Sequence, residues 1–281
     1  MPRTNGGALA TALPKTVSRI TLRTEFDAAA WETRHDVGMT DVRATLDFVL
    51  SPYLSATCSI LNDGTDALVV DPGLEVHEEV TNVLEEQGLN LRAILVSHGH
   101  LDHVADAALL ASQFDVPVYV GARDEYRLED PMGQLPSAFT NQIRPRWDAR
   151  GWSKPADVRP LGDGDALDAG NLRLVAHAYP GHTEGSTLYF FDGPVHINPL
   201  VGVTPRALTT PALAFTGDVL FKGTIGRTDL PGGNPEEMKA SLTKLRGFAL
   251  EHAEAVIVPG HGPLSIFRDE LADNGYLRTA F

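Results

Sequence analysis

The sequence predicts an α/β protein in which helices cover a mixed or parallel sheet. Short apolar runs typical of buried strands alternate with segments whose apolar residues recur at helical spacing. The chain has 281 residues, of which 43% are hydrophobic, and this is enough for a large buried core. We therefore expect one large domain, or two closely packed halves, over residues 41–281.

The first half of the chain predicts five strands and two helices. Strands are expected over 44–50, 58–61, 67–70, 91–96 and 117–120. A helix over 75–88 is predicted by the spacing of Val76, Val80 and Leu84, and Gly88 is a residue type that commonly ends helices. A second helix is expected over 102–114, where apolar residues again recur at helical spacing.

The second half contains two stretches without a clear pattern. Residues 130–168 hold five prolines among scattered glycines, and we expect a long connection; residues 192–211 predict an inserted hairpin or a surface loop. Strands are expected over 172–176, 187–191, 212–215 and 255–258. Asn234 is a typical N-cap residue and is followed by Pro235 and two glutamates, so a helix is predicted from there to about residue 252.

Residues 1–40 are expected to form an N-terminal arm that is partly flexible. The first 24 residues contain four basic side chains and no acidic one. No apolar stretch approaches the roughly 20 residues that span a bilayer, and no signal-peptide core is visible, so we expect a cytoplasmic protein without membrane contact.

The composition narrows the possible partners. The formal net charge is −14, and such an acidic chain lacks the basic surface that binding to nucleic acid requires. A small-molecule substrate fits better, and the chain is expected to be a monomer or a homodimer. Cys58 is the only cysteine, which excludes an intramolecular disulfide and a zinc-thiolate cluster; we expect it to be a small buried strand residue.

A dense group of metal-binding residue types follows the expected strand 91–96. It reads His98-x-His100-x-Asp102-His103. Side chains on an extended segment alternate, so His98 and His100 project to the same side and can reach one metal ion. Asp102 and His103 lie where helical spacing begins, and they would point from the first turn toward the same place.

Three further candidate ligands each stand directly after an apolar strand: His182, Asp218 and His261. Functional groups in α/β layers gather at the carboxyl ends of strands, so these side chains are predicted to meet the first group in one crevice. Asp71 also follows a strand. It either orients a ligand imidazole or caps a turn before Pro72.

Five imidazoles and two carboxylates without a thiolate suit two divalent metal ions. Zinc is the expected metal, with iron or manganese as alternatives. We assign His98, His100 and His182 to one ion and Asp102, His103 and His261 to the other. Asp218 and a water bridge them, and that water is ionised to hydroxide at neutral pH.

These motifs resemble the metallo-β-lactamase superfamily in the order and context of every metal-ligand motif. The segments on which the resemblance rests are Ser97-His98-x-His100-x-Asp102-His103, Pro180-Gly181-His182-Thr183, Gly217-Asp218 and Pro259-Gly260-His261-Gly262. The resemblance covers roughly residues 44–275 and implies an αββα sandwich that holds a dinuclear site at one edge.

Within that superfamily, the segments 216–221 and 226–233 look like those of the glyoxalase II group, particularly its short bacterial members. The resemblance implies a hydrolase of thioesters of the S-lactoylglutathione type, with Arg227 where longer members carry a basic residue that contacts glutathione. Their helical C-terminal domain has no counterpart after His261, and Asp229 stands where they carry a tyrosine. The negative charge of Asp229 would repel an anionic thiol carrier, so the sequence does not identify the carrier.

The expected mechanism is attack of the bridging hydroxide on a thioester carbonyl, with His100, Asp102 and Asp218 as the catalytic residues and Asp102 also orienting the hydroxide. One alternative is a persulfide dioxygenase with a single iron on His98, His182 and Asp218. Another is hydrolysis of lactones or β-lactams on the same fold. A non-catalytic binding protein and a nuclease are disfavoured, the first by the complete ligand set and the second by the acidic charge.

Overall fold

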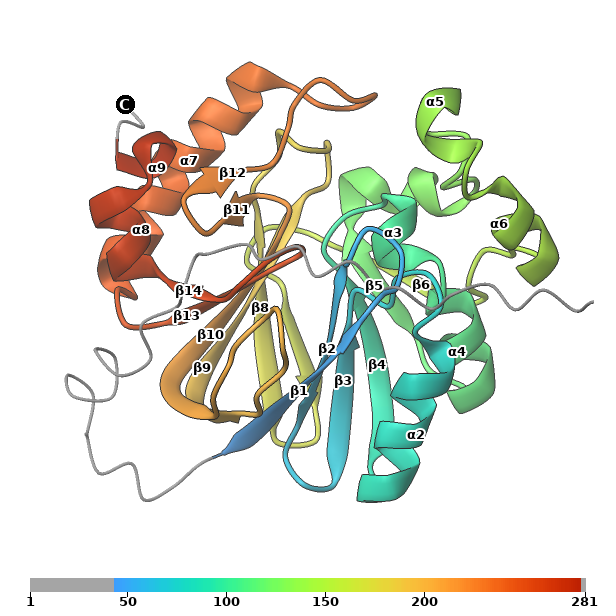
Figure 1. Ribbon diagram of the computed structural model, residues 1–281. Coiled ribbons are helices and arrows are strands. Elements are labelled where there is room, and N and C mark those ends of the chain that lie inside the picture. The colour runs from blue at the N-terminus through green and yellow to red at the C-terminus, as the bar shows by residue number, and fades with distance from the viewer. Residues whose placement is uncertain (1–42, 279–281) are drawn as a thin grey trace, which may run out of the picture.

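The computed structural model describes residues 43–278, so the predicted N-terminal arm lies outside the described residues. Helices form the two outer layers and strands lie between them, with α2 and α4 on one side and α7, α8 and α9 on the other (Figure 1). This arrangement confirms the predicted α/β class. Within residues 43–278, no helix has the length and apolar character needed to cross a membrane.

The first half of the chain builds strands in the order β1-β2-β3-β4-β5-β6, and β3 to β6 run parallel to one another. Its elements are β1 (Ala44–Leu50), β2 (Thr57–Asn62), β3 (Asp66–Val70), α2 (His77–Gln87), β4 (Asn90–Val96), α3 (Leu101–Val104), α4 (Ala107–Phe114), β5 (Val118–Gly121), the 3-10 helix η1 (Ala122–Leu128), α5 (Ser137–Thr140), α6 (Arg144–Arg150) and β6 (Val158–Leu161).

The second half builds the order β7-β8-β9-β10-β13-β14. Its elements are β7 (Ala166–Ala169), β8 (Leu172–Ala178), β9 (Thr187–Ile197), β10 (Leu208–Gly217), β11 (Leu220–Phe221), β12 (Thr224–Ile225), α7 (Pro235–Glu251), β13 (Val256–Pro259), β14 (Ser265–Ile266), α8 (Phe267–Asp273) and α9 (Gly275–Arg278). The strand β9 joins the halves: β10 pairs with one edge, and β8 and then β1 share the other.

The strands bury both faces, which explains why they appear in the sequence as continuous apolar runs. In β3, Leu68 and Val70 belong to the core between the sheets, whereas Val69 packs under α2 and α4. In β9, Tyr189 faces the core between the sheets and Phe190 faces α7. Because side chains alternate between the two faces of each strand, the same strands contribute apolar residues to the central core and to the two layers beneath the helices. Cys58 is fully buried in β2, as expected.

The prediction of one continuous helix over 102–114 is wrong, because the structure has two helices, α3 and α4, with a break between them. At the break, the backbone N–H of Asp106 donates to the carbonyl of Pro72 (3.0 Å) rather than to a helical neighbour. The buried Asp106 carboxylate accepts the backbone N–H groups of Val76 and His77, each at 2.8 Å. Asp106 therefore serves the start of α2, and this tertiary role overrides the local helical pattern.

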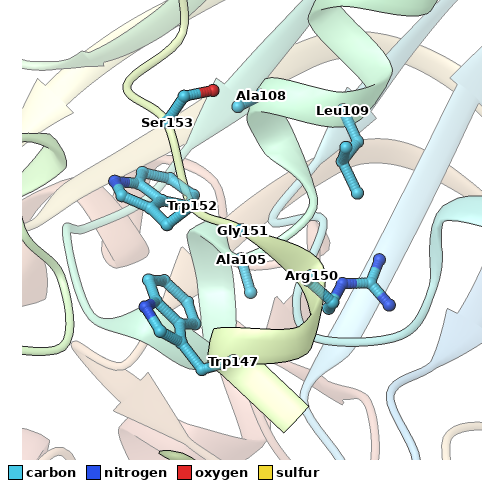
Figure 2. Close-up of a pocket in the computed structure, with 8 residues that line it drawn as sticks. All are labelled: Ala105, Ala108, Leu109, Trp147, Arg150, Gly151, Trp152 and Ser153. Carbon is cyan, nitrogen blue, oxygen red and sulfur yellow. The ribbon is translucent and has the colours of Figure 1, made fainter.

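Residues 130–168 are predicted to form a long connection, and the structure shows that this connection contains α5, α6 and β6 and runs into β7. The prolines occupy positions that tolerate them: Pro136 precedes α5, Pro145 lies in the first turn of α6, and Pro160 lies on the edge strand β6. Figure 2 shows how α6 is attached, with the rings of Trp147 and Trp152 stacked beside α4 at a centroid distance of 5.1 Å.

Residues 192–211 form a hairpin, one of the two predicted possibilities. They extend β9 to Ile197 and start β10 at Leu208. The pairing of the two strands is irregular between Thr210 and Ala212, at the position of Pro211. A proline there removes one donor without ending the strand.

The helix α7 begins as predicted. The Asn234 side chain accepts the backbone N–H groups of Glu236 (2.9 Å) and Glu237 (3.2 Å), which would otherwise lack partners inside the helix. Met238, Leu242 and Leu245 are then buried against β9, β10 and β13. The N-cap therefore helps to hold the helix that covers this half of the core.

Replacing Asn234 by Ala should destabilise the protein by about 1 kcal/mol, which lowers the melting temperature by about 2–4 °C in a protein of this size. Thermal unfolding followed by circular dichroism measures the change. Asn234→Ser keeps an oxygen acceptor and is the control, expected to melt close to the wild type. An equal loss in both variants would contradict the role of the cap.

Candidate metal centre

The predicted ligands come from the carboxyl ends of four strands. The strand β4 ends at Val96, directly before the His98 and His100 segment, and β8 leads to His182. The parallel strands β10 and β13 lead to Asp218 and His261. The structure brings all seven predicted side chains together in three overlapping groups, whose ligand atoms lie within 4.8 Å of one another in each group.

The first group contains three buried imidazoles, those of His98, His100 and His182. The Nδ1 atom of His100 lies 3.1 Å from Nε2 of His98 and 2.9 Å from Nε2 of His182. Three ring nitrogens therefore face one point. Burial and the neighbouring imidazoles hold the pKa values of His98 and His100 well below their usual range. Both rings are thus neutral at pH 7, which is the form that binds metals.

Hydrogen bonds on the outer side show which ring nitrogens carry protons. The Nδ1–H of His182 donates to the carbonyl of Arg227 (2.7 Å), because a carbonyl only accepts. The Ser97 hydroxyl donates to Asp71, so it accepts from Nδ1 of His98 at 3.1 Å. In the neutral rings, Nε2 of both histidines therefore presents a lone pair to the inside. Lone pairs facing one another at about 3 Å need a cation between them.

The second group contains Asp102, His103 and His261. An oxygen of Asp102 lies 3.3 Å from Nε2 of His261 and 3.7 Å from Nε2 of His103. The Nδ1–H of His261 donates to the carbonyl of Leu54 (3.2 Å) on the outer side. The ring of His261 is 27% exposed and forms the open side of this group, whereas that of His103 is fully buried.

The carboxylate of Asp218 lies between the two groups. Its Oδ1 is 3.5 Å from Nε2 of His103, and its Oδ2 is 3.5 Å from Nε2 of His182 and 3.7 Å from that of His261. A glycine is required beside it, because a methyl group on Gly260 would overlap both the Asp218 carboxylate and the His103 ring. Asp218 thus reaches both groups, which is the geometry of a bridging ligand.

Buried polar atoms without partners show that the cluster fits a metal ion. Nε2 of His103 and Oδ1 of Asp218 are both buried and make no hydrogen bond within the described residues. The two atoms lie 3.5 Å apart without forming a hydrogen bond, and a buried polar atom that makes no hydrogen bond costs about 1–3 kcal/mol. Coordination to divalent cations would satisfy them, and a set of imidazoles and carboxylates suits zinc, iron or manganese.

Charge at the second group also favours a cation. Burial alone would lower the pKa of His103, but the carboxylates of Asp102, Asp218 and Asp71 outweigh it and raise that pKa to about 10. Burial opposes ionisation of Asp102 as well, yet the imidazoles of His103 and His261 hold its pKa below the usual range. The Asp102 carboxylate therefore stays ionised and attracts positive charge, from a proton or from a metal.

Asp71 takes the first of the two roles that the sequence left open. Its Oδ1 accepts the backbone N–H of Ser97 and its Oδ2 accepts the Ser97 hydroxyl, both at 2.6 Å. Oδ2 also accepts Nδ1–H of His103 at 3.1 Å, which directs Nε2 of that ring to the inside. One carboxylate thereby orients ligands from both groups.

Asp124 and Arg127, in η1, are functional residues that the sequence interpretation missed. The fully buried carboxylate of Asp124 accepts the backbone N–H of Gly99 (2.8 Å), the Thr183 hydroxyl (2.7 Å) and the backbone N–H of Gly185 (2.7 Å). It therefore ties the loop of His98 and His100 to the loop of His182. A signal existed, because Asp124 follows a strand end as the ligands do.

Arg127 supports this link from the other side. Its fully buried guanidinium lies 3.3 Å from Oδ1 of Asp124, contacts Glu184 at 2.6 Å and donates to the carbonyl of Pro231 at 2.8 Å. The aliphatic part of Arg127 packs directly on Gly99, where a methyl group would not fit. Gly99 is thus constrained on one side by Arg127 and on the other by Asp124.

The cluster forms the floor of a cleft with a volume of about 550 Å³. Its lining consists of the cluster side chains and a mainly apolar wall: Tyr53, Leu54, His100, Leu101, Asp102, Leu135, Gln142, Ile143, His182, Asp218, Phe221, Arg227, Leu230 and His261. Arg227, predicted to bind substrate, lies on this wall and forms a bidentate ion pair with Asp229. The arrangement offers a metal-binding floor next to room for a small substrate.

Comparison with known proteins finds a family match and close relatives. The family described as the Metallo-beta-lactamase superfamily matches residues 51–195, just over half of the chain. The hydroxyacylglutathione hydrolase GloC of Haemophilus influenzae is 32% identical over 229 residues, covering 79% of this chain and 92% of the relative.

Two solved structures share the fold over most of this chain. The structure of the BLEG-1 B3 metallo-beta-lactamase is 28% identical, has a TM-score of 0.64 and covers 83% of this chain and 99% of its own. The structure of TTHA1623 in a di-iron-bound form is 28% identical and has a TM-score of 0.60. The match covers 82% of this chain and 99% of the TTHA1623 chain. The second one holds two irons on the same fold.

Replacing Asp124 by Asn should weaken zinc binding about 10- to 100-fold, because an amide group cannot accept all three hydrogen bonds that position the ligand loops. Competition with a chromophoric chelator measures the affinity.

The matched control is Asp168→Asn, which removes a carboxylate from an exposed pair with Arg173 far from the cleft lining. It should leave zinc affinity unchanged. Wild-type affinity in the Asp124 variant would show that the link between the two loops does not position the ligands.

Proposed function

This chain is a hydrolase of the metallo-β-lactamase superfamily, and we propose that it hydrolyses thioesters of hydroxyacyl groups with two divalent metal ions. One observation carries the proposal: five of the seven clustered side chains, those of His100, Asp102, His182, Asp218 and His261, line a cleft whose described lining contains no thiol, aliphatic hydroxyl or amine. The described lining therefore offers no serine, threonine, cysteine or lysine nucleophile. Water activated at the cluster is the remaining nucleophile.

The proposed ligand sets follow the geometry. One ion is held by His98, His100 and His182, the other by Asp102, His103 and His261, and Asp218 bridges them. The inward lone pairs of the first group and the unpaired Oδ1 of Asp218 support this arrangement. We propose zinc as the metal, because imidazole-rich sites without thiolate suit it, and the di-iron form of TTHA1623 makes iron the alternative.

When bound, two such ions supply a Lewis acid for the substrate carbonyl and lower the pKa of a water molecule enough to give hydroxide at neutral pH. The protein supplies orientation. Asp102 and Asp218 both line the cleft, where their carboxylates would accept hydrogen bonds from the attacking water. His100 contributes its ring to the same wall, and Asp71 holds the ring of His103 from behind.

The chemistry of the leaving group favours a thioester over an amide. A thiol with a pKa near 8.5 departs as thiolate without strong acid assistance, whereas an amine must be protonated as it leaves. Apart from the proposed metal ligands, the described lining offers only the Tyr53 hydroxyl as a neutral acid. The name of the Haemophilus influenzae relative, a hydroxyacylglutathione hydrolase, supports the same substrate class.

The test is hydrolysis of S-D-lactoylglutathione by anaerobically purified protein loaded with zinc or iron, followed by loss of thioester absorbance. Turnover should depend on the metal and proceed without oxygen. The variants His100→Ala and Asp102→Ala should lose at least 100-fold in kcat and bind less metal. His196→Ala, on β9 away from the cleft lining, is the matched control and should retain wild-type activity.

Full activity in either ligand variant would contradict the proposal. A β-lactam and a persulfide are assayed alongside. Preferential hydrolysis of the β-lactam would favour the activity named for BLEG-1, and oxygen consumption with the persulfide would favour a single-iron dioxygenase.

A further inference from the structure

We propose that the cleft selects thioesters whose thiol portion is apolar and uncharged, and that Asp229 sets this preference by neutralising Arg227. The inference rests on the proposed thioester hydrolysis and names the substrate class for it. Three features of the described residues carry it: the composition of the cleft wall, the loop that presents Leu54, and the ion pair between Arg227 and Asp229.

The wall of the cleft is apolar beyond the metal-binding floor. Its apolar members come from separate parts of the chain: Tyr53, Leu54, Leu101, Leu135, Ile143, Phe221 and Leu230. Apart from the Tyr53 hydroxyl, Gln142 is the single neutral polar side chain in the described lining, and Arg227 is the single cation there apart from histidine. A wall of this kind stabilises a bound group mainly by removing its apolar surface from water.

The loop between β1 and β2 presents one of these apolar side chains to solvent. Leu54 is 60% exposed, although it is a large hydrophobic residue on the cleft wall. Leu54 and Ser55 both have a φ of 54°, in the left-handed region that side chains other than glycine rarely adopt. The carbonyl of Leu54 accepts Nδ1–H of His261, so this loop is held directly beside the proposed metal site.

Such backbone strain is commonly found where function requires a particular orientation. Here the strained loop holds an exposed leucine at the mouth of the cleft, next to the metal-binding floor. An apolar substrate group lying on the wall would cover Leu54 and remove it from water.

Arg227, the cation on the cleft wall, forms an ion pair with Asp229. Nε and one terminal nitrogen of Arg227 donate to the two oxygens of Asp229, at 2.6 and 2.8 Å. These hydrogen bonds lower the pKa of Asp229 to about 2, so the carboxylate is ionised at neutral pH. The bidentate face of the guanidinium, which would otherwise bind a substrate carboxylate, is therefore already used.

The segment that carries this pair is held at both ends. The carbonyl of Arg227 accepts from His182, and the carbonyl of Pro231 accepts from the buried Arg127. Leu230, between them, lines the cleft. A carboxylate on the thiol carrier would have to displace Asp229 from Arg227 and then remain next to its negative charge. An uncharged thiol carrier would neither displace Asp229 nor be repelled by its charge.

The ion pair is exposed, so it contributes little to stability, and Asp229 can be replaced without unfolding the protein. This makes it a suitable position for a specificity test. The test compares two esters with the same acyl group: S-D-lactoylglutathione, whose thiol portion carries two carboxylates, and S-D-lactoyl-N-acetylcysteamine, whose thiol portion is uncharged.

In the metal-loaded wild type, kcat/KM for the uncharged ester should be at least about tenfold higher. Asp229→Asn should raise kcat/KM for the glutathione ester about 3- to 10-fold through KM and leave the uncharged ester within twofold. Asp229→Glu keeps the charge and should retain the wild-type preference. Asp157→Asn, in an exposed pair with Arg159 outside the cleft lining, is the matched control.

A wild type that prefers the glutathione ester, or an Asp229→Asn variant whose KM for it is unchanged, would overturn the proposal. Binding is measured separately by calorimetry with S-hexylglutathione and S-hexyl-N-acetylcysteamine, thioethers that have no acyl group to hydrolyse. Hydrolysis of neither ester would overturn the proposed function. The thioether titrations still decide the selectivity of the cleft in that case: tighter binding of the uncharged one, lost in Asp229→Asn, supports it, and equal binding contradicts it.

Discussion

Hydrogen bonds on the outer side of the imidazoles are the interactions on which the rest of the site depends. Asp71, the Ser97 hydroxyl and the carbonyls of Leu54 and Arg227 each accept an Nδ1–H and so direct the Nε2 atom of that ring inward. Every acceptor belongs to a segment that the sheets position. The fold therefore determines the protonation of the ligands as well as their location, and cation binding relieves the repulsion that this creates.

Buried carboxylates outside the cluster hold the ligand loops in place. Asp71 and Asp124 accept backbone N–H groups next to the ligands, and Asp106 accepts those at the start of α2. An ionised carboxylate is expensive to bury unless such donors surround it. Because each one is satisfied by donors from separate segments, moving any of these loops would leave a buried charge without partners. This explains why a cluster built from four loops keeps one geometry.

Much of the site could be predicted from the sequence because its residues follow apolar runs. His182, Asp218 and His261 each come directly after a strand, and the parallel direction of β10 and β13 brings two of them together. The roles of Asp124 and Arg127 could not be predicted, because their partners lie in segments distant along the chain. The interruption at Asp106 and the two helices within residues 130–168 likewise depend on tertiary contacts that override local pattern. The ion pair between Arg227 and Asp229 could not be predicted either, because it depends on the conformation of the loop that carries both residues.

The central claim is that Asp218 bridges two cations held by separate groups of ligands. Anomalous diffraction from crystals of the zinc-loaded protein, recorded on both sides of the zinc edge, tests it most directly. If Asp218 bridges two cations, two peaks should flank its carboxylate, about 3.5–4 Å apart, one beside His100 and the other beside His261. A single peak bound by His98, His182 and Asp218, with His261 and Asp102 turned away from it, would rule out the bridging role.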